Sequence, residues 1–189
     1  MKKKLNLVTI IASFIFAVFL YLFTTDVDKS EVNQVEAALL EKYKEQLSGK
    51  VRVIDGDSLD IEGAKIRLIG IDAPEVKQTC FNSGGKQYNC GLDSKKFLAD
   101  IAQDKEGKCF YNKKDIYQRF LAVCVVADII VNQALLESGM AVIYDYSKPD
   151  PVNFELEQKA RENKIGIWQG EFQLPKDYRK SKRKPKKNE

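Results

Sequence analysis

Two short strand patterns flank a turn signal in the run Val51-Arg-Val-Ile-Asp-Gly-Asp-Ser-Leu-Asp-Ile-Glu62. The turn falls on the Asp-Gly-Asp sequence in the middle of the run, and residues 58–62 then alternate polar and apolar side chains, as a half-buried strand does. Gly63 turns the chain into a third pattern, Lys65-Ile-Arg-Leu-Ile-Gly-Ile71, which Ala73-Pro74 ends. Consecutive strands joined by tight turns predict a β-meander.

The chain up to residue 172 supplies two further strand patterns and three helical ones. A polar, glycine-containing loop is expected from Val76 to Gly91. The expected strands are residues 107–112 and 119–126, and the expected helices are residues 92–102, 132–138 and 154–163. The pattern is α+β and mainly β, and it predicts a five-stranded barrel of the OB type with about three packing helices over residues 50–172.

An export or membrane signal precedes the predicted domain. Met1-Lys-Lys-Lys4 is followed by an apolar run from Leu5 to Phe23, which is near the length that spans a bilayer. The leading lysines favour an N-terminus inside the cell and the rest of the chain outside. No small-x-small cleavage site follows the run directly, so residues 1–25 are expected to be an uncleaved anchor, with secretion after cleavage as the alternative. Residues 26–49 carry apolar positions at helical intervals and predict a helical spacer.

The basic residues gather at the two ends of the chain, although the formal net charge is only +4. Lysines crowd the first four residues, and basic residues greatly outnumber acidic ones from Lys176 to Glu189, so the globular part is mildly acidic. We expect residues 173–189 to be a disordered basic tail that attracts nucleic acid or anionic lipid without specificity. The chain has no histidine, which favours an oxygen-liking ion such as Ca²⁺ over a transition metal.

The four cysteines agree with export. None forms the CxxC spacing of a zinc site, and four cysteines allow three different pairings. A Cys80–Cys90 bond would close a short polar loop, and a Cys109–Cys124 bond would join two strands that flank a predicted hairpin turn. We expect these two disulfides, and the alternative is four free thiols.

Two acidic clusters lie at predicted strand ends, Asp55-Gly-Asp57 and Asp72-Ala-Pro-Glu75. Either cluster alone is typical of a solvated turn. Arg67 changes that interpretation, because it lies in an otherwise apolar strand and a half-buried arginine needs a carboxylate or a phosphate as its partner. Arg119 begins a later predicted strand. Carboxylates that hold a divalent ion beside arginines that bear phosphoryl charge are what a phosphodiesterase site needs, and without histidine a carboxylate such as Glu75 is the simplest general base.

Several segments resemble the thermonuclease family, which is staphylococcal nuclease-like and has an OB fold. They are Val53-Ile-Asp-Gly-Asp-Ser58, Ile66-Arg-Leu-Ile-Gly-Ile-Asp-Ala-Pro-Glu75, Asp115-Ile-Tyr-Gln-Arg119, Val131-Asn-Gln-Ala-Leu-Leu-Glu-Ser-Gly-Met-Ala141 and Leu156 to Trp168. The resemblance covers roughly Lys50 to Gly170, and the order and spacing of the motifs together make it specific. The chain departs from the family at residues 115–119, where the family often has Asp-Lys-Tyr-Gly-Arg.

The resemblance implies a metal site and a general base. Ca²⁺ would bind the side chains of Asp57 and Asp72 and the backbone carbonyl of Ala73, a position where the family often has threonine. Glu75 would act as the general base on the attacking water. The expected reaction is hydrolysis of DNA, RNA or both to products with 3′-phosphate ends.

The resemblance also implies the groups that hold the substrate. Arg67 and Arg119 would grip the scissile phosphate and stabilise the five-coordinate transition state. The residues expected to line the nucleotide pocket are Tyr117, Tyr144 and Tyr146.

Two other functions fit parts of the pattern. A catalytically inactive OB-fold module on a membrane stalk would bind nucleic acid, but without a metal its acidic clusters would repel phosphate. A calcium-dependent structural module would not need Arg67 and Arg119, which would repel the ion. We therefore expect a membrane-anchored nuclease outside the cytoplasm, with nucleic acid and the membrane as its partners and no obligate protein partner.

Overall fold

The computed structural model describes residues 33–145 and 149–183, and the chain forms two compact units that divide between residues 42 and 43. The first unit contributes the helix of residues 33–42. This helix ends well before Gly49, the expected end of the spacer, because the chain from Glu45 onward pairs with another strand. The predicted anchor, residues 1–25, lies outside the described residues, among which no helix is both long and apolar enough to cross a bilayer.

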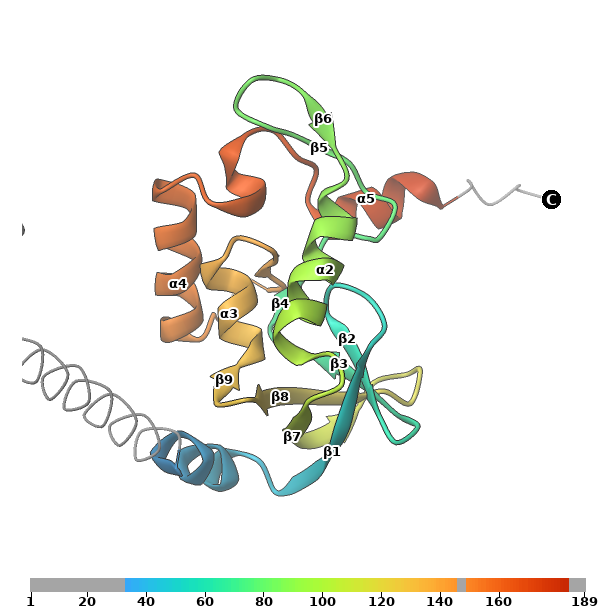
Figure 1. Ribbon diagram of the computed structural model, residues 1–189, viewed down its shortest axis with the longest axis vertical. Helices are drawn as coiled ribbons and strands as arrows, with labels where there is room; N and C mark the ends of the chain where they lie inside the picture. Colours follow the sequence, from blue (N-terminus) through green and yellow to red (C-terminus); the bar gives the residue numbers. More distant parts are fainter. Residues whose placement is uncertain (1–32, 146–148, 184–189) are drawn as a thin grey trace, which may run out of the picture. The chain divides into compact units, whose positions relative to one another are not determined.

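The second unit is built on a closed five-stranded barrel (Figure 1). Its strands are β1 Glu45–Val53, β2 Ser58–Ile61, β3 Ala64–Leu68, β7 Glu106–Lys114 and β8 Phe120–Val126. They pair in the order β3-β2-β1-β7-β8, and a parallel pairing of β3 with β8 closes the ring. The predicted OB-type barrel is confirmed, and its meander forms the first three strands.

Three helices form where helical patterns were predicted, two of them against the barrel and the third against the second helix (Figure 1). They are α2 Cys90–Ala102, α3 Val131–Glu137 and α4 Pro151–Glu162. Leu98 of α2 and Leu135 of α3 are fully buried in one apolar core with Leu59 and Ile66 of the barrel. This burial is what fixes the helices on the barrel, since apolar area removed from water is the main stabilising term.

Short paired segments complete the unit. β4 Ile71–Asp72 pairs with β10 Val142–Ile143, β9 Ile129–Ile130 extends the edge of β8, and β5 Cys80–Phe81 pairs with β6 Gln87–Tyr88. The 3-10 helix η1 Gly166–Gln169 leads into α5 Pro175–Lys182. The expectation of a disordered tail from residue 173 is therefore wrong for its described part, because α5 begins with a proline at its first turn and docks against the loop after β4.

Both predicted disulfides form, and no cysteine is free. Cys109 and Cys124 are direct partners in the register of β7 and β8, so their bond crosslinks the barrel wall. Cys80 and Cys90 link β5 to the start of α2 and close the loop that follows β4. One bond therefore belongs to the barrel and the other to the segment against which α5 docks.

Candidate active site

A cavity of about 880 Å³ opens between three barrel connections and α5. Its walls come from the turn before β2, the segment from β3 through Glu75, the turn between β7 and β8, and one face of α5. The predicted site residues that line it are Asp57, Arg67, Ala73, Glu75, Tyr117, Arg119 and Tyr144. The fold thus brings residues from distant parts of the sequence into one cleft.

Arg67 links two buried carboxylates: Asp57, which lines the cleft, and Asp72, which is not among the lining residues. Its Nη1 donates to Oδ1 of Asp57, and its Nη2 donates to Oδ1 of Asp72 at 2.9 Å and to the backbone carbonyl of Ile71 at 3.4 Å. The side chains of Asp57 and Asp72 are only 6% and 2% exposed. Burial lowers the pKa of Arg67, whereas the charge and hydrogen bond of Asp72 raise it, and arginine remains protonated at neutral pH in either case. The expected anionic partner of Arg67 is therefore this pair of carboxylates.

Backbone pairing holds the two carboxylates in place. Asp57 accepts a hydrogen bond from the backbone N–H of Ala73 at 2.9 Å through Oδ2, which ties the β1–β2 turn to the end of β4. Asp72 lies opposite Val142 in the β4–β10 pair. The strand pairing fixes the backbone of Asp72, and Arg67 holds both carboxylates, so the fold and these ion pairs together set their spacing.

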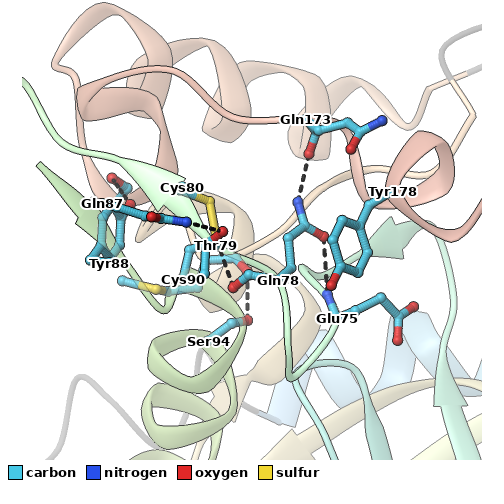
Figure 2. Close-up of a disulfide and its surroundings, with 12 residues drawn as sticks. Glu75, Gln78, Thr79, Cys80, Gln87, Tyr88, Cys90, Ser94, Gln173 and Tyr178 are labelled. Carbon is cyan, nitrogen blue, oxygen red and sulfur yellow. Dashed lines mark hydrogen bonds between the residues drawn. A yellow bond between two sulfur atoms is a disulfide. The ribbon is translucent and has the colours of Figure 1, made fainter. Parts of the chain in front are cut away.

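Glu75 differs from the two aspartates in its exposure. Its side chain is 43% exposed, while its backbone is held on two sides. Figure 2 shows the fully buried Gln78 between Glu75 and Gln173: Gln78 accepts from the backbone N–H of Glu75 at 3.2 Å and donates to the carbonyl of Gln173 at 2.6 Å. Any side chain at Gly91 would collide with the carbonyl of Glu75, so only glycine lets α2 begin there. A fixed backbone therefore presents a water-accessible carboxylate to the cleft.

Arg179 of α5 is a site residue that the sequence analysis missed. Its Nη1 donates to Oδ1 of Asp72 at 2.8 Å and to Oε1 of Glu75 at 3.0 Å, and its Nη2 donates to Oδ2 of Asp72 at 2.9 Å. The hydrogen bond to Asp72 raises the pKa of Arg179 further above its ordinary value. A proline at the start of α5 and basic residues at helical spacing were the available signals, but a dense run of charge was read as disorder.

Arg119 lies on the opposite wall, held by the turn that precedes it. Its Nε and Nη2 donate to Oδ2 of Asp115 at 2.8 and 2.7 Å, while Oδ1 accepts from the backbone of Tyr117 at 2.8 Å and of Arg119 at 3.0 Å. Burial alone would raise the pKa of Asp115, but the bonds from Arg119 and Tyr117 together lower it. Gln118 adopts a φ of +62°, in the region that favours glycine, so this turn keeps a glycine-like conformation without the glycine of the family pattern.

Two of the three tyrosines that were predicted to line the nucleotide pocket are among the described residues, and both line the cleft. Tyr117 and Tyr144 line the cleft with exposed fractions of 70% and 56%, and the Tyr117 ring lies 5.5 Å from the guanidinium carbon of Arg119. Exposed rings at the mouth of a cleft are available to stack on a base. Tyr146 lies outside the described residues.

The oxygen atoms around Asp57 and Asp72 suit a hard cation, since two carboxylates lie beside the Ala73 backbone. No group of three or more His, Cys, Asp or Glu side chains that could hold a metal occurs in the described ranges. Both oxygens of Asp72 accept hydrogen bonds from arginines. The donor chemistry fits Ca²⁺ with water completing its shell, provided that the cation replaces some of these arginine contacts.

The sequence of this chain is similar to a nuclease family model and to several known proteins. Residues 65–170 match the family model described as staphylococcal nuclease homologue. The succinoglycan biosynthesis protein ExoI of Rhizobium meliloti is 35% identical over 146 residues, which are 74% of this chain and 76% of that protein. An uncharacterized endonuclease of Escherichia coli O157:H7 is 32% identical, over 66% of this chain and 78% of its own length. A micrococcal nuclease of Shigella flexneri is 32% identical, over 62% of this chain and 71% of its own length.

Proposed function

This chain belongs to the staphylococcal nuclease family and is a nuclease, and from that premise we propose that it is a Ca²⁺-dependent phosphodiesterase that cuts DNA, RNA or both. Asp57, Asp72 and the carbonyl of Ala73 are the ligands of the ion in this proposal. The products carry 3′-phosphate ends. The family supports this assignment, and so does the oxygen-only chemistry of the two buried carboxylates.

The carboxylates differ in solvent exposure, and this difference, which assigns metal binding and proton abstraction to different residues, is the main support for the proposal. Asp57 and Asp72 are buried and fixed, so they are suited to hold a cation. Glu75 is the accessible carboxylate beside them, so it is suited to take a proton from the attacking water. If all three carboxylates were exposed, or all three buried, their exposure would not distinguish the metal ligands from the general base.

The arginines act on the phosphate. Arg67 and Arg119 face the cleft from β3 and from the β7–β8 turn, and each guanidinium can donate two hydrogen bonds to phosphate oxygens as charge grows on them. A bound Ca²⁺ would add positive charge beside the same oxygens. As the water oxygen bonds to phosphorus, its proton passes to Glu75, the bond from phosphorus to the 5′-oxygen breaks, and that oxygen takes a proton from solvent.

The proposal is tested with the purified chain and with labelled DNA and RNA, in Ca²⁺ or in a chelator. Cleavage only with Ca²⁺, with 3′-ends that a phosphatase can dephosphorylate, is the expected result. Glu75→Gln should lower the rate by about 10²–10⁴-fold while the protein keeps its fold by circular dichroism. Binding without cleavage under every divalent ion would instead support the inactive nucleic-acid-binding module.

The proposal extends to where the enzyme works, which is outside the cytoplasm on an N-terminal membrane anchor. Two disulfides support an oxidising compartment, and the basic and apolar start of the sequence supports the anchor. Fractionation of cells, followed by protease treatment of intact cells, tests both points. A chain found in the soluble cytoplasmic fraction would contradict them.

A further inference from the structure

Helix α5 lies beyond the residues that match the family model, yet it is docked firmly beside the active site. The hydroxyl of Tyr178 donates to the carbonyl of Lys77 at 3.0 Å, and the buried Pro175 begins the helix. The backbone of Phe81 donates to the carbonyl of Glu171 at 2.8 Å, which holds the approach to the helix. α5 is thus an added wall of the cleft and not a free extension of the chain.

One face of α5 is basic and points into the cleft. The residues that line the cavity from α5 and its end are Lys176, Arg179, Lys180 and Arg183, which follow one another at the spacing of a single helix face. At a rise of about 1.5 Å per residue, this face is about 10 Å long, enough to meet about two consecutive phosphates of a strand. Lys113 and Lys114 line the cavity from the β7–β8 turn, so cations border the cleft on more than one wall.

Arg179 is engaged differently from its three neighbours on this face. Its guanidinium binds Asp72 and Glu75, so in this structure its donors are occupied by the two carboxylates. Lys176, Lys180 and Arg183 are exposed. The ion pair of Lys180 with Asp177, at 3.3 Å, is between exposed groups and therefore weak. These three cations are available to an anionic ligand in the cleft.

We propose that the basic face of α5, through Lys176, Lys180 and Arg183, binds backbone phosphates of the nucleic-acid strand next to the scissile phosphate. The inference rests on the proposed phosphodiesterase function, because that function places a polyanionic strand in this cleft. The position of the face selects nucleic acid over an anionic lipid surface, since the side chains line a cleft shared with Arg67 and Arg119. α5 is then a substrate-binding element that lies outside the segment matched by the family model.

The test measures binding separately from cleavage. The triple substitution Lys176→Gln, Lys180→Gln and Arg183→Gln is made in a Glu75→Gln background, and binding of a labelled single-stranded oligonucleotide is titrated over a range of salt concentrations with Ca²⁺ present. The slope of log affinity against log salt should fall in magnitude by about 0.7 for each lost phosphate contact, or about 1.4 for the two phosphates that this face can meet. The matched control replaces Lys50, Lys86 and Lys96, which are exposed lysines that do not line the cavity, and its slope should stay at the parent value.

A second measurement uses the triple variant with Glu75 intact. Its kcat/KM on long single-stranded DNA should fall, while its kcat/KM on bis(p-nitrophenyl) phosphate, which is too small to reach α5, should be unchanged. Equal salt slopes for the α5 variant and the control variant would overturn the inference. So would an α5 variant that no longer binds anionic phospholipid vesicles but still binds the oligonucleotide as the parent does. If the parent enzyme cleaves neither substrate, the proposed function fails, while the salt slopes still report on α5 by themselves.

Discussion

Two arginines bind the same carboxylate, Asp72, from two very different parts of the molecule. Arg67 comes from β3, inside the closed barrel, and its side chain is 14% exposed. Arg179 comes from α5, outside the matched family domain, and its side chain is 33% exposed. The barrel contact is fixed by sheet register on two sides, with Ser58 and with Leu121, whereas the α5 contact depends on an eight-residue helix.

This difference indicates which of the two arginine contacts with Asp72 a bound cation or substrate can replace. The backbone of Arg67 is fixed because β3 is hydrogen-bonded to both β2 and β8, and turning its side chain away would leave the buried Asp57 without its arginine partner. Moving Arg179 requires only rotation of a partly exposed side chain or local undocking of α5, and short peripheral elements open at far lower cost than core strands. Arg67 is therefore a permanent part of the site, and Arg179 is the contact that a cation or a substrate can displace.

The largest effect is expected at Arg67. Arg67→Ala leaves the buried Asp57 without its arginine and leaves Asp72 with Arg179 alone, so the free energy of unfolding should fall by about 3–5 kcal/mol. The kcat/KM should fall at least about 100-fold, because a donor to the transition-state phosphate is lost. Denaturant unfolding and steady-state kinetics measure the two effects.

Arg119→Ala is the matched control for that substitution. Arg119 is 31% exposed and pairs with one partly exposed carboxylate, so its removal should cost a similar factor in rate and less than about 1 kcal/mol in stability. Equal losses of unfolding free energy in the two variants would show that burial of the Arg67 ion pairs does not increase their contribution to stability.

Removing each of the two disulfides should affect a different region of the molecule. Replacing Cys109 and Cys124 by alanine should lower the free energy of unfolding by about 3 kcal/mol, because the bond constrains the unfolded barrel strands. Replacing Cys80 and Cys90 should instead loosen the loop that carries Gln78, and with it α5. Hydrogen exchange checks this: amides of α5 should lose protection in the second variant, and loss in both would mean that α5 is not held through this loop.

A smaller effect is expected at Arg179. Arg179→Ala frees both oxygens of Asp72 from one competing cation, so the affinity for Ca²⁺ should rise about tenfold by calorimetry, as removal of a partly screened charge predicts. Stability without Ca²⁺ should change by less than about 1 kcal/mol, since the side chain is partly exposed. Weaker binding of Ca²⁺ in this variant would mean that Arg179 supports the metal site instead of competing for it.

The smallest effect is expected at Asp115, whose pKa the contacts with Arg119 and Tyr117 lower. A carboxyl with a depressed folded pKa stabilises the protein above its unfolded pKa of about 4, and that contribution is lost as the pH falls through the lower folded value. Wild-type protein should therefore be more stable than Asp115→Asn at neutral pH, and the difference should shrink below about pH 4. Thermal melts across this range measure it, and a constant difference would exclude the linkage.

Local patterns carried the prediction of the barrel and of most of the cleft. The alternation in β2, the turn at Asp55-Gly56-Asp57 and the apolar strand around Arg67 depend on neighbouring residues, and β2, the turn and β3 form at these places. Two details differ from the prediction: β2 is buried at every residue instead of half-buried, and β3 ends at Leu68, before the expected end at Ile71. The meeting of Arg67 with Asp57 and Asp72 could be anticipated, because a buried guanidinium needs an anionic partner. The catalytic and metal-binding roles of these residues stay predictions.

Long-range contacts were out of reach of the same patterns. The sequence pattern predicts Glu45–Gly49 as the end of a spacer helix, but these residues pair with β7 and form a strand, since a ladder partner far along the chain outweighs local preference. Arg179 was missed because its contacts with Asp72 and Glu75 depend on Gln78 and Tyr178, which dock the chain across a long sequence separation. Charge density alone predicted disorder there.

From the order of its residues alone, this protein's barrel, its carboxylates at strand ends, its disulfide pairs and its nuclease family could be inferred, because strand alternation, turn residues and motif spacing are properties of short segments. Which arginines share Asp72, and that a basic helix walls the cleft, emerged only in three dimensions. Those contacts join β3, β4 and α5, and the closure of the barrel and the docking of α5 bring them together.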